Sequence, residues 1–461
     1  MLKTSLVVAG ALALVACSTD RAAAPESQGS DLAHPDIVTA SQPTGIHLVR
    51  YTGGAESKAR AAIAARGGKV LRQLPEIGVL YVSGLGDAGF RALSSSAAIK
   101  SIAADYVAPL RPAPSRLVAG SRARGGPRAQ GTDQSSAQFY PFQWNMRSAA
   151  ANTAWVPSGG GAGELVCVLD TGIDPGHLDL SGRVAANRQA TVILNPRFPS
   201  DVTPLDYDFH GTFVASLITS NGIGMASVAP NAQICAIKVL SQDGRGTFGD
   251  VVAGMVLAAN WNAHVINLSL GGVLDVSEPR FASIAAFVQQ GVNYALSRGS
   301  LVVAAAGNLG VNFDEVPKRF INIPSMLSGV VSVGATAPTN QQNFDQLATY
   351  SNFGGIRTLD MVAPGGDLVA GGVTTDLMLA ACSQYAASLP FACGATSYLF
   401  ASGTSFASPM VAGAAAVVES TKGAMTTAAL EACLESTADK VGSKSIFGAG
   451  RLNVFKAISC T

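Results

Sequence analysis

Four polar residues stand where strand-like or helix-like segments of this chain begin or end. Asp170 and Asn308 each follow an apolar, strand-like run, while His210 and Ser405 each open a helix-like segment. Transfer of an acyl group to water needs a nucleophile, a base, a carboxylate that orients the base, and an amide donor for the oxyanion. These residue types supply those groups, and Asp, His, Ser is one of the known chain orders of such triads. Taken singly, each has an ordinary alternative, because Asp forms turns and Ser caps helices in any protein.

The elements that would position these residues alternate along the chain from residue 163 onward. Continuous apolar strands separated by helices predict a parallel sheet buried on both faces, and hence an α/β fold. In such sheets, sites form at the carboxyl ends of the strands. The expected strands are 164–169, 233–240, 265–270, 301–306, 330–334 and 359–362, and the expected helices are 212–219, 249–262, 283–298 and 405–419.

A smaller domain is predicted ahead of this one, over residues 44–107. Strand-like and helix-like segments alternate there as a βαββαβ, ferredoxin-like α+β unit. Its expected strands are 46–51, 69–74, 78–83 and 100–107, and its expected helices are 56–66 and 87–99. Residues 108–140 form a linker rich in Pro, Gly and Ser, where proteolysis concentrates, and residues 141–461 would be the large domain. The linker carries arginines that we expect to be solvated: Arg111, Arg116, Arg122, Arg124 and Arg128.

The first 17 residues predict an export signal. An apolar run, 6–16, follows Lys3 and ends directly before Cys17, as in secretory signal peptides. Leu14-Val15-Ala16-Cys17 resembles a bacterial lipobox, which predicts lipid attachment at Cys17; the alternative is an ordinary signal peptide that contains a cysteine. Residues 18–43 would be a flexible tether. The precursor is therefore expected to be exported and anchored in a membrane, at the outer membrane or the cell surface.

Six cysteines remain after Cys17, and an even number in an exported chain indicates disulfides. Cys382 and Cys393 would close a short loop, and Cys433 and Cys460 would tie the C-terminal tail to a helix. Cys167 and Cys235 lie in apolar strand-like runs, so they form either a third disulfide or two buried free thiols.

Composition excludes several classes of function. The net charge is +1 and 13% of the residues are charged, which argues against a nucleic-acid-binding protein, because such proteins carry a basic face. Beyond the N-terminus, no apolar run reaches the roughly 18 uninterrupted residues that a spanning helix needs. The sequence therefore predicts a globular body.

Several short motifs resemble those of the subtilisin-like serine peptidase (subtilase) family. The resemblance covers roughly residues 140–461, and the leading domain is similar to the inhibitory propeptide of that family. It implies that Asp170, His210 and Ser405 form the triad and that Asn308 is the oxyanion donor. The motifs are Asp170-Thr-Gly-Ile-Asp174, His210-Gly-Thr-Phe-Val-Ala215, Asn267-Leu-Ser-Leu-Gly-Gly272, Ala306-Gly-Asn308, Tyr350-Ser-Asn-Phe-Gly354, Ala363-Pro-Gly365 and Gly403-Thr-Ser-Phe-Ala-Ser-Pro409.

The same resemblance implies where a polypeptide substrate would bind. An extended substrate would lie as an added strand between two segments, one formed by Gly244, Arg245 and Gly246 and the other by Ser269, Leu270 and Gly271. Ala305, Ala306 and Gly307 would line the pocket for the side chain before the scissile bond. Small residues there favour large apolar side chains in the substrate, although close packing of strand and helix requires small residues as well.

The chain also departs from the pattern of many relatives. Phe213 and Met410 stand where many of them carry histidine, and neither position takes part in the chemistry. The segment 219–227 is short for the calcium-binding loop of the family, which leaves Asp179 as a weak candidate ligand for a structural calcium ion. No cofactor is expected for the chemistry, and His177 is interpreted as structural.

The sequence therefore favours an exported serine endopeptidase made as a zymogen that its own propeptide inhibits. A cut in 108–140 would separate the catalytic domain from Cys17, so the mature domain would be released. The alternative is a catalytically inactive protein of the same fold that binds partners at the surface. An esterase of the α/β-hydrolase type is excluded by the order of the triad and by a nucleophile motif that is not Gly-x-Ser-x-Gly.

Overall fold

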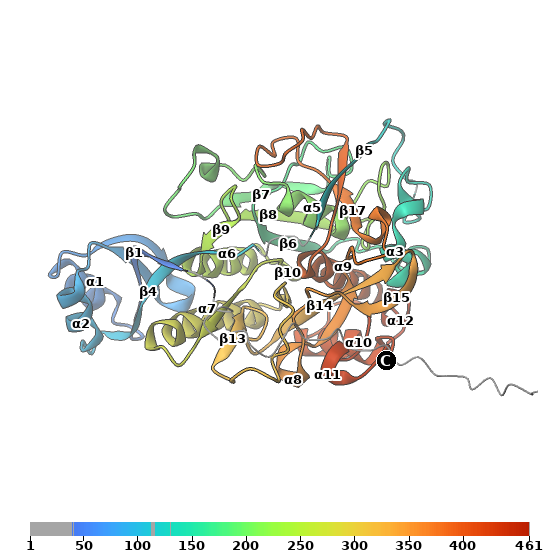
Figure 1. Cartoon of the computed structure of the whole chain (residues 1–461). Helices are drawn as coiled ribbons and strands as arrows, with labels where there is room; N and C mark the ends of the chain where they lie inside the picture. The colour runs from blue at the N-terminus through green and yellow to red at the C-terminus, as the bar shows by residue number, and fades with distance from the viewer. Residues whose placement is uncertain (1–38, 40, 112–115, 130, 461) are drawn as a thin grey trace, which may run out of the picture.

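The computed structural model describes residues 39, 41–111, 116–129 and 131–460. A small lobe formed by the first residues of this part projects from a larger α/β body (Figure 1). The predicted export signal, including Cys17, and the tether as far as residue 38 lie outside the described residues. Within the described part, no helix combines the length and the apolar character that a membrane crossing requires.

The small lobe has the βαββαβ order expected from the sequence. Its antiparallel strands, in the order β2-β3-β1-β4, bury alternate side chains such as Val49 and Leu80 against two helices. The side chains between them, such as Leu48 and Tyr81, are buried against the large domain, so both faces of this sheet are covered. The bounds are β1 Gln42–Tyr51, α1 Glu56–Ala64, β2 Lys69–Leu74, β3 Val79–Ser83, α2 Asp87–Ser94 and β4 Ile99–Pro109.

An eight-stranded, mostly parallel sheet organises the large domain. Its order is β15-β14-β12-β10-β6-β8-β7, with β16 paired to β14, and the β14–β15 pair is antiparallel. The bounds are β6 Leu165–Asp170, β7 Val184–Thr191, β8 Gln233–Lys238, β10 Val265–Leu268, β12 Leu301–Ala305, β14 Val330–Thr339, β15 Gln342–Leu347 and β16 Met361–Pro364. Short strands β11 Gly272–Asp275 and β13 Phe320–Ile323 pair outside this sheet.

Helices cover both faces of this sheet, as the continuous apolar strands predicted. Along β6, Val166 and Val168 pack with α5 and α9, whereas Cys167 and Leu169 pack with α6 and α7. The fold is therefore the α/β fold expected from the sequence. The longer helices are α5 His210–Ile218, α6 Phe248–Asn260, α7 Pro279–Ser297, α9 Thr404–Lys422 and α10 Thr427–Thr437; the short ones are α3 Trp144–Ser148, α4 Ala151–Ala154, α8 Gly355–Thr358, α11 Lys444–Phe447 and α12 Val454–Ala457.

Three disulfides join the six cysteines of the described part. Cys382–Cys393 and Cys433–Cys460 are the two pairs that the sequence predicted. Cys167 and Cys235 are paired as well, because they lie opposite each other in the β6–β8 register. Of the two alternatives that the sequence left open, the structure thus has the third disulfide and not the buried thiols.

Part of the predicted linker is a strand of the large domain. β5 (Leu117–Arg122) pairs with β18 (Ser397–Ala401), which pairs with β17 (Met378–Ala381). The expectation that all the linker arginines are solvated is also wrong. Arg111 is the exception, because its side chain is mostly buried and ion-paired. Arg116, Arg122, Arg124 and Arg128 are exposed as expected, although Arg128 also donates a hydrogen bond of 2.6 Å to the backbone oxygen of Ser181. Linker composition indicated solvation, but it carries no information about the partners that the fold supplies.

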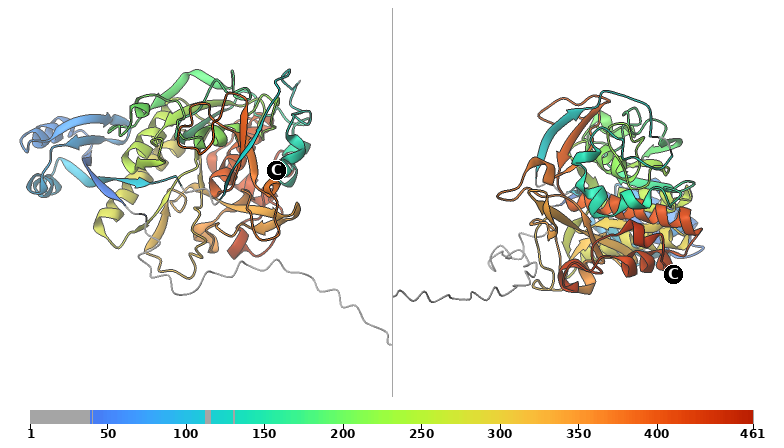
Figure 2. Two further views of the ribbon diagram at one scale, coloured as in Figure 1. Left: turned by 45° about the horizontal axis from the view of Figure 1, so that its top comes forward. Right: turned by 90° about the vertical axis from the view of Figure 1, so that its right-hand side faces the viewer.

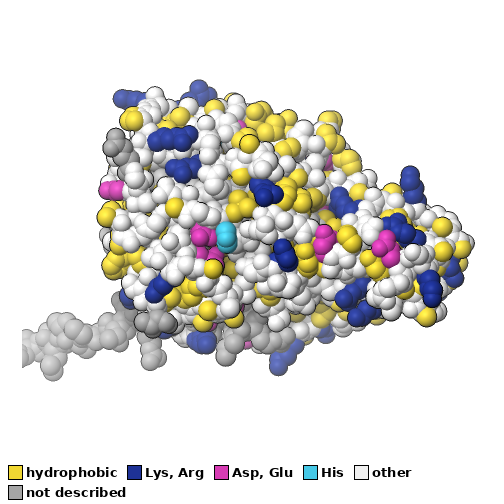
Figure 3. Space-filling view, turned by 180° about the vertical axis from the view of Figure 1, so that it is seen from behind, with side chains coloured by type: hydrophobic (Ala, Val, Ile, Leu, Met, Phe, Trp, Pro, Cys, Tyr) yellow, Lys and Arg dark blue, Asp and Glu magenta, His cyan; other side chains and the backbone are white. Residues whose placement is uncertain are grey.

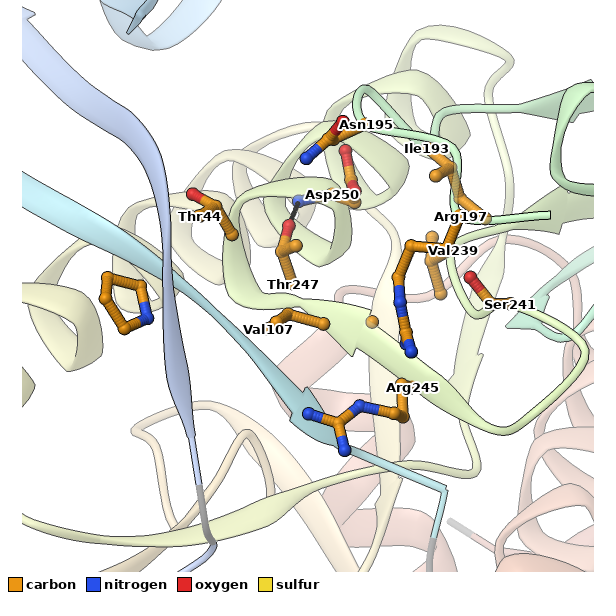
Figure 4. A pocket seen from close by; sticks show the side chains of 12 residues that line it. Thr44, Val107, Ile193, Asn195, Arg197, Val239, Ser241, Arg245, Thr247 and Asp250 are labelled. Carbon is orange, nitrogen blue, oxygen red and sulfur yellow. Dashed lines mark hydrogen bonds between the residues drawn. The ribbon is translucent and has the colours of Figure 1, made fainter.

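The small lobe is attached to the large domain along β9 (Arg245–Thr247), α6 and α7 (Figure 2). β4 pairs with β9 in antiparallel register, so the two domains share one five-stranded sheet. Tyr106 of β4 packs on Phe281 of α7, and the Tyr81 hydroxyl donates to the backbone oxygen of Gly249 at 2.6 Å. A pocket of about 210 Å³ lies at this junction (Figure 4), and its lining includes Pro43, Thr44 and Val107 from the lobe and Arg197, Arg245 and Asp250 from the large domain.

Charged side chains are dispersed over the surface of the molecule that Figure 3 shows. Basic and acidic groups are interspersed on this face, without a broad basic patch. This distribution agrees with the near-neutral net charge of +1. It gives that face no electrostatic footprint for nucleic acid.

Candidate active site

The predicted carboxylate and base are brought together at the edge of the sheet. Asp170 is the last residue of β6 and His210 is the first residue of α5. His210 Nδ1 lies 2.8 Å from Asp170 Oδ1, and both side chains are buried. A carboxylate at this distance holds the proton on Nδ1 and leaves Nε2 as the basic atom. Among the described residues, His210 Nε2 has no hydrogen-bond partner.

The turn before His210 is held by a carboxylate that the sequence reasoning missed. Asp206 Oδ1 accepts hydrogen bonds from the Thr171 hydroxyl at 2.8 Å and from the backbone of Phe209 at 3.1 Å. Its Oδ2 accepts from the backbone and the hydroxyl of Thr212, at 2.9 and 2.6 Å. These bonds support Phe209 at a φ of 145°, a strained value for a residue with a side chain. The signal available in the sequence for this role was the acidic residue four positions before His210.

Ser405 lies in the first turn of α9, and a proline one turn later shapes its surroundings. Pro409 has no N–H, so the carbonyl of Ser405, four residues earlier, lacks its helical donor. The Ser269 hydroxyl supplies the missing hydrogen bond, at 2.6 Å. In return, Ser405 Oγ donates to the Ser269 carbonyl at 3.2 Å. In this state the serine hydroxyl therefore bonds to the neighbouring segment and not to His210.

Asn308 is fixed by the residue before the serine. The backbone N–H and the hydroxyl of Thr404 donate to Asn308 Oδ1, at 2.9 and 2.7 Å. This arrangement places Asn308 Nδ2 beside Gly403. If residue 403 had a side chain, its Cβ would lie only 3.2 Å from Nδ2. Gly403 therefore gives the amide room beside Ser405, at the place where a tetrahedral oxyanion would form.

The chain's own residues 107–111 lie between the two predicted substrate-binding segments. Val107 to Pro109 pair with β9, and the Arg111 N–H donates to the Gly244 carbonyl at 3.0 Å. On the other side, the Gly271 N–H donates to the Leu110 carbonyl at 2.8 Å. The main chain is thus held from both sides, as an extended peptide would be in β-augmentation. Beyond the gap at 112–115, the Arg116 carbonyl accepts from the Ser402 N–H at 3.3 Å.

Comparison with known proteins gives the family. Residues 161–450 match the family model described as the subtilase family, Peptidase_S8. The chain belongs to the subtilase family. It is a subtilisin-like serine endopeptidase, as are its relatives. Thermitase of Thermoactinomyces vulgaris is 33% identical over 69% of this chain and 97% of its own. Subtilisin BL of Lederbergia lenta is 35% identical over 67% of this chain and 96% of its own.

Solved structures agree with the fold of this subtilase. The crystal structure of the epidermin leader peptide processing serine protease of Staphylococcus aureus has a TM-score of 0.72, at 22% identity, and covers 91% of this chain and 98% of its own. Fervidolysin of Fervidobacterium pennivorans, a keratinolytic enzyme related to subtilisin, has a TM-score of 0.70 at 21% identity; the match covers 92% of this chain and 62% of fervidolysin. Both likenesses concern the fold alone.

The predicted pocket residues of this subtilase end β12 and lead to Asn308. Ala305, Ala306 and Gly307 are all buried. The Ala306 carbonyl accepts from the side-chain amide of Asn352 at 2.8 Å, and Gly307 has a φ of 100°, where a Cβ would lie 2.4 Å from that amide. Glycine is therefore required at 307 by packing, and the size of the substrate side chain stays a prediction.

The other singled-out residues lie in apolar or structural settings. Phe213 packs on Phe406, with ring centroids 4.2 Å apart, and Met410 Sδ accepts from the Asn145 amide at 3.7 Å. His177 is buried, with Nε2 3.0 Å from the carbonyl of Ser397. It bonds to neither Asp170 nor Ser405, which supports its interpretation as structural.

The surroundings of Asp179 do not fit a calcium ion. Its Oδ1 accepts from the backbone N–H of Ile223 at 2.8 Å, and its Oδ2 accepts from the N–H groups of Gly224 and Met225 and from the Tyr398 hydroxyl, at 3.0, 2.9 and 2.5 Å. Calcium binds through oxygen lone pairs, and here donors occupy them. The short loop 219–227 is thus anchored by hydrogen bonds to this carboxylate.

We expect excess EDTA to leave the unfolding temperature of the protease unchanged, and Asp179→Asn to lower its stability by at least about 2 kcal/mol, because buried donors lose a charged acceptor. Thermal unfolding with and without EDTA measures both effects. Any EDTA-induced fall would contradict the first expectation, and a fall that disappears in Asp179→Asn would place the ion at Asp179. A fall that instead disappears in Glu431→Gln would come from the acidic cluster of Asp360, Glu431 and Glu435, whose ligand atoms lie within 4.8 Å of one another.

Proposed function

We propose that this subtilase is an exported serine endopeptidase that hydrolyses polypeptides through Asp170, His210, Ser405 and Asn308 and is made as a self-inhibited zymogen. The observation that carries the proposal is the position of residues 107–111. They lie between β9 and Gly271, where a substrate strand would lie, and Arg111 is ion-paired with Asp208, two residues before His210.

The chemistry follows from the atoms at the sheet edge. The Ser405 hydroxyl turns from the Ser269 carbonyl to His210 Nε2 and attacks the peptide carbonyl while Nε2 takes its proton. Asp170 holds the imidazole and stabilises the imidazolium that forms. Asn308 Nδ2 and the Ser405 N–H bind the oxyanion. His210 then protonates the leaving amine, and water releases the acyl group from Ser405.

The leading domain would inhibit the enzyme by occupying the groove of its substrates. β4 takes the edge of β9, so no other polypeptide can pair there while the lobe is docked. The predicted cut lies within 108–140. Within that range we favour the stretch between Arg111 and Arg116. Arg111 bonds to Gly244 in a predicted substrate-binding segment, and Arg116 bonds to Ser402, three residues before Ser405.

A cut there would also separate the mature domain from the predicted lipid on Cys17. We propose that the precursor is membrane-anchored through that lipid and that the mature domain is released once the lobe dissociates. Fractionation of cells that express the full chain tests this idea. Mature enzyme that stays with the membrane after a wash that removes the leading domain would contradict it.

Docking of the leading domain is expected to weaken as the pH rises. Burial, with the nearby charge of Asp250, raises the pKa of Asp105 on β4 to about 7, although the N–H of Gly249 at 3.1 Å stabilises its charge. After separation the exposed carboxyl titrates near its usual pKa, around 4. The docked state therefore binds the extra proton, so docking is strongest below about pH 4 and weakens as the pH passes through about 7.

We therefore expect the processed complex to dissociate at least about tenfold more readily at about pH 8 than at about pH 5. The measurement is the rate at which activity appears after dilution. Asp105→Asn keeps the acceptor for Gly249 without the charge and should flatten this dependence, whereas Asp87→Asn, at an exposed site on α2, should not. An unchanged dependence in Asp105→Asn would assign the effect to another group.

Covalent labelling with a serine-directed phosphonate tests the catalytic part of the proposal. Wild-type protease, once processed, is expected to carry the label on Ser405, located by peptide mapping. Prior denaturation should prevent labelling, since reactivity depends on the assembled triad. A folded, processed protein that takes no label would instead support the catalytically inactive binding protein.

A further inference from the structure

A buried acidic side chain two residues before the catalytic histidine faces the groove and binds a basic side chain. Arg111 Nη2 lies 3.3 Å from Asp208 Oδ2, and the Asp208 side chain is 1% exposed while that of Arg111 is 17% exposed. The guanidinium carbon of Arg111 also lies 5.8 Å from the centre of the Phe209 ring. Arg111 belongs to the segment that occupies the substrate groove, so this contact is also one that a substrate side chain could make.

The groove is shaped for this side chain. A Cβ at residue 244 would lie 2.6 Å from Arg111 Nε, so glycine at this position leaves the space that the Arg111 side chain occupies. In the described part of the chain, Arg111 is the only basic side chain within ion-pair distance of Asp208. The Asp208 carboxylate also accepts hydrogen bonds from the backbone N–H of His210 at 3.3 Å and from the hydroxyl of Ser388 at 3.5 Å.

Departure of the leading domain would leave Asp208 without its cation. Water would then reach this carboxylate, which Arg111 covers in the docked state. A substrate that covers it again without a cation would leave a buried, unpaired carboxylate, which is costly, and the acidic neighbours Asp206 and Asp170 add repulsion. A substrate that brings its own cation restores the pair. An apolar substrate side chain would leave the charge unpaired, so the site discriminates between the two.

We infer that Asp208 and Phe209 form a subsite for a basic side chain, and that this protease prefers polypeptides with arginine at the position that Arg111 occupies, on the acyl side of the scissile bond. The inference rests on the proposed function and names a substrate class for the same groove. Arginine should be favoured over lysine, because a planar guanidinium can both pair with Asp208 and stack on Phe209. This preference is separate from the apolar pocket predicted at Ala305 to Gly307.

The test is cleavage-site profiling of a random peptide library by the processed protease, with the cleaved bonds identified by mass spectrometry. We expect arginine to be enriched at least about tenfold over glutamine at one acyl-side position, the loss typical of breaking a buried charge pair. Asp208→Asn should abolish the enrichment, and Asp208→Lys should replace it by a preference for acidic residues. Asp345→Asn is the control. Asp345 lies on the edge strand β15 and is ion-paired with Arg451, so this variant should keep the enrichment of arginine.

The possible outcomes separate this inference from the proposed function. Cleavage without basic enrichment would overturn the subsite and leave the endopeptidase proposal standing. Enrichment that survives in Asp208→Asn would overturn the assignment to Asp208. A processed protein that neither cleaves the library nor takes the phosphonate label would overturn the proposed function itself.

A second measurement needs no variant. In the docked state, where a guanidinium covers the carboxylate as an arginine substrate would, burial raises the pKa of Asp208 to about 6, even though Arg111 and His210 lower it. The ratio of kcat/KM for an arginine peptide to that of its glutamine counterpart should therefore fall several-fold from about pH 8 to about pH 5, as the carboxylate takes up a proton. Protonation of His210 affects both peptides alike and cancels in the ratio. A ratio that does not change with pH would contradict a carboxylate subsite.

Discussion

Ser405→Ala is expected to leave the exported chain at full length, whereas wild type is cut within 108–140. Without Ser405 Oγ no acyl-enzyme can form, and removal of a triad nucleophile typically lowers kcat by about 10⁶. Intact mass and N-terminal sequencing of both proteins measure the result. Ser420→Ala is a matched control, because Ser420 lies near the far end of the same helix, α9, and bonds to Val417 and Gly161. It should be processed like wild type.

Each other outcome has a definite meaning. If Ser405→Ala is cut like wild type, another peptidase performs maturation, and the proposal of self-processing is wrong. Activity of the two proteins on casein would then still test Ser405 as the nucleophile. If neither protein is cut and wild type is inactive on casein, the leading domain is a permanent part of the molecule. That result would favour the binding protein over the enzyme. Addition of active wild type to purified Ser405→Ala shows whether the cut can occur between molecules.

Local sequence was sufficient to predict the α/β fold and to bring out the four candidate residues. Asp170 and Asn308 follow parallel strands, whose carboxyl ends lie at one edge of the sheet, and helices that follow such strands begin at the same edge. The adjacency of Asp170, His210 and Asn308 could therefore be inferred without knowing the strand order. The Asp170–His210 contact of 2.8 Å fits that inference. The Cys167–Cys235 pair is different, since it depends on β6 and β8 being neighbours in register. Apolar periodicity predicts strands, but it does not specify their order.

The features that the sequence did not predict all depend on contacts between distant segments. Asp206 stabilises the turn before His210 through donors such as Thr171, which lies 35 residues away. The pairing of β4 with β9 joins segments more than a hundred residues apart. Linker composition predicts a solvated Arg111, but the environment of its side chain is formed by Asp208 and Gly244. Composition predicts the exposure of a charged side chain correctly only where the fold does not bring a buried partner to it.

Asn308→Ala is expected to lower kcat by about 10²–10³ with KM nearly unchanged, the loss typical of removing one oxyanion donor. A donor that acts only on the tetrahedral oxyanion contributes little to binding of the substrate. Steady-state kinetics of the processed protease on a peptide substrate measure both constants. Asn312→Ala is the control, because Asn312 bonds to Glu315 on the exposed surface. It should leave kcat unchanged.

Alanine at 308 also removes the acceptor of Thr404, so a second variant is needed to separate the two roles. Asn308→Asp keeps an oxygen for the N–H and the hydroxyl of Thr404, which lie at 2.9 and 2.7 Å from Oδ1. It replaces Nδ2, however, with a negatively charged oxygen beside the oxyanion. If Asn308 only positions the start of α9, the aspartate variant should retain most of the activity. If its Nδ2 binds the oxyanion, the aspartate variant should lose at least as much kcat as alanine, because repulsion is added to the missing hydrogen bond.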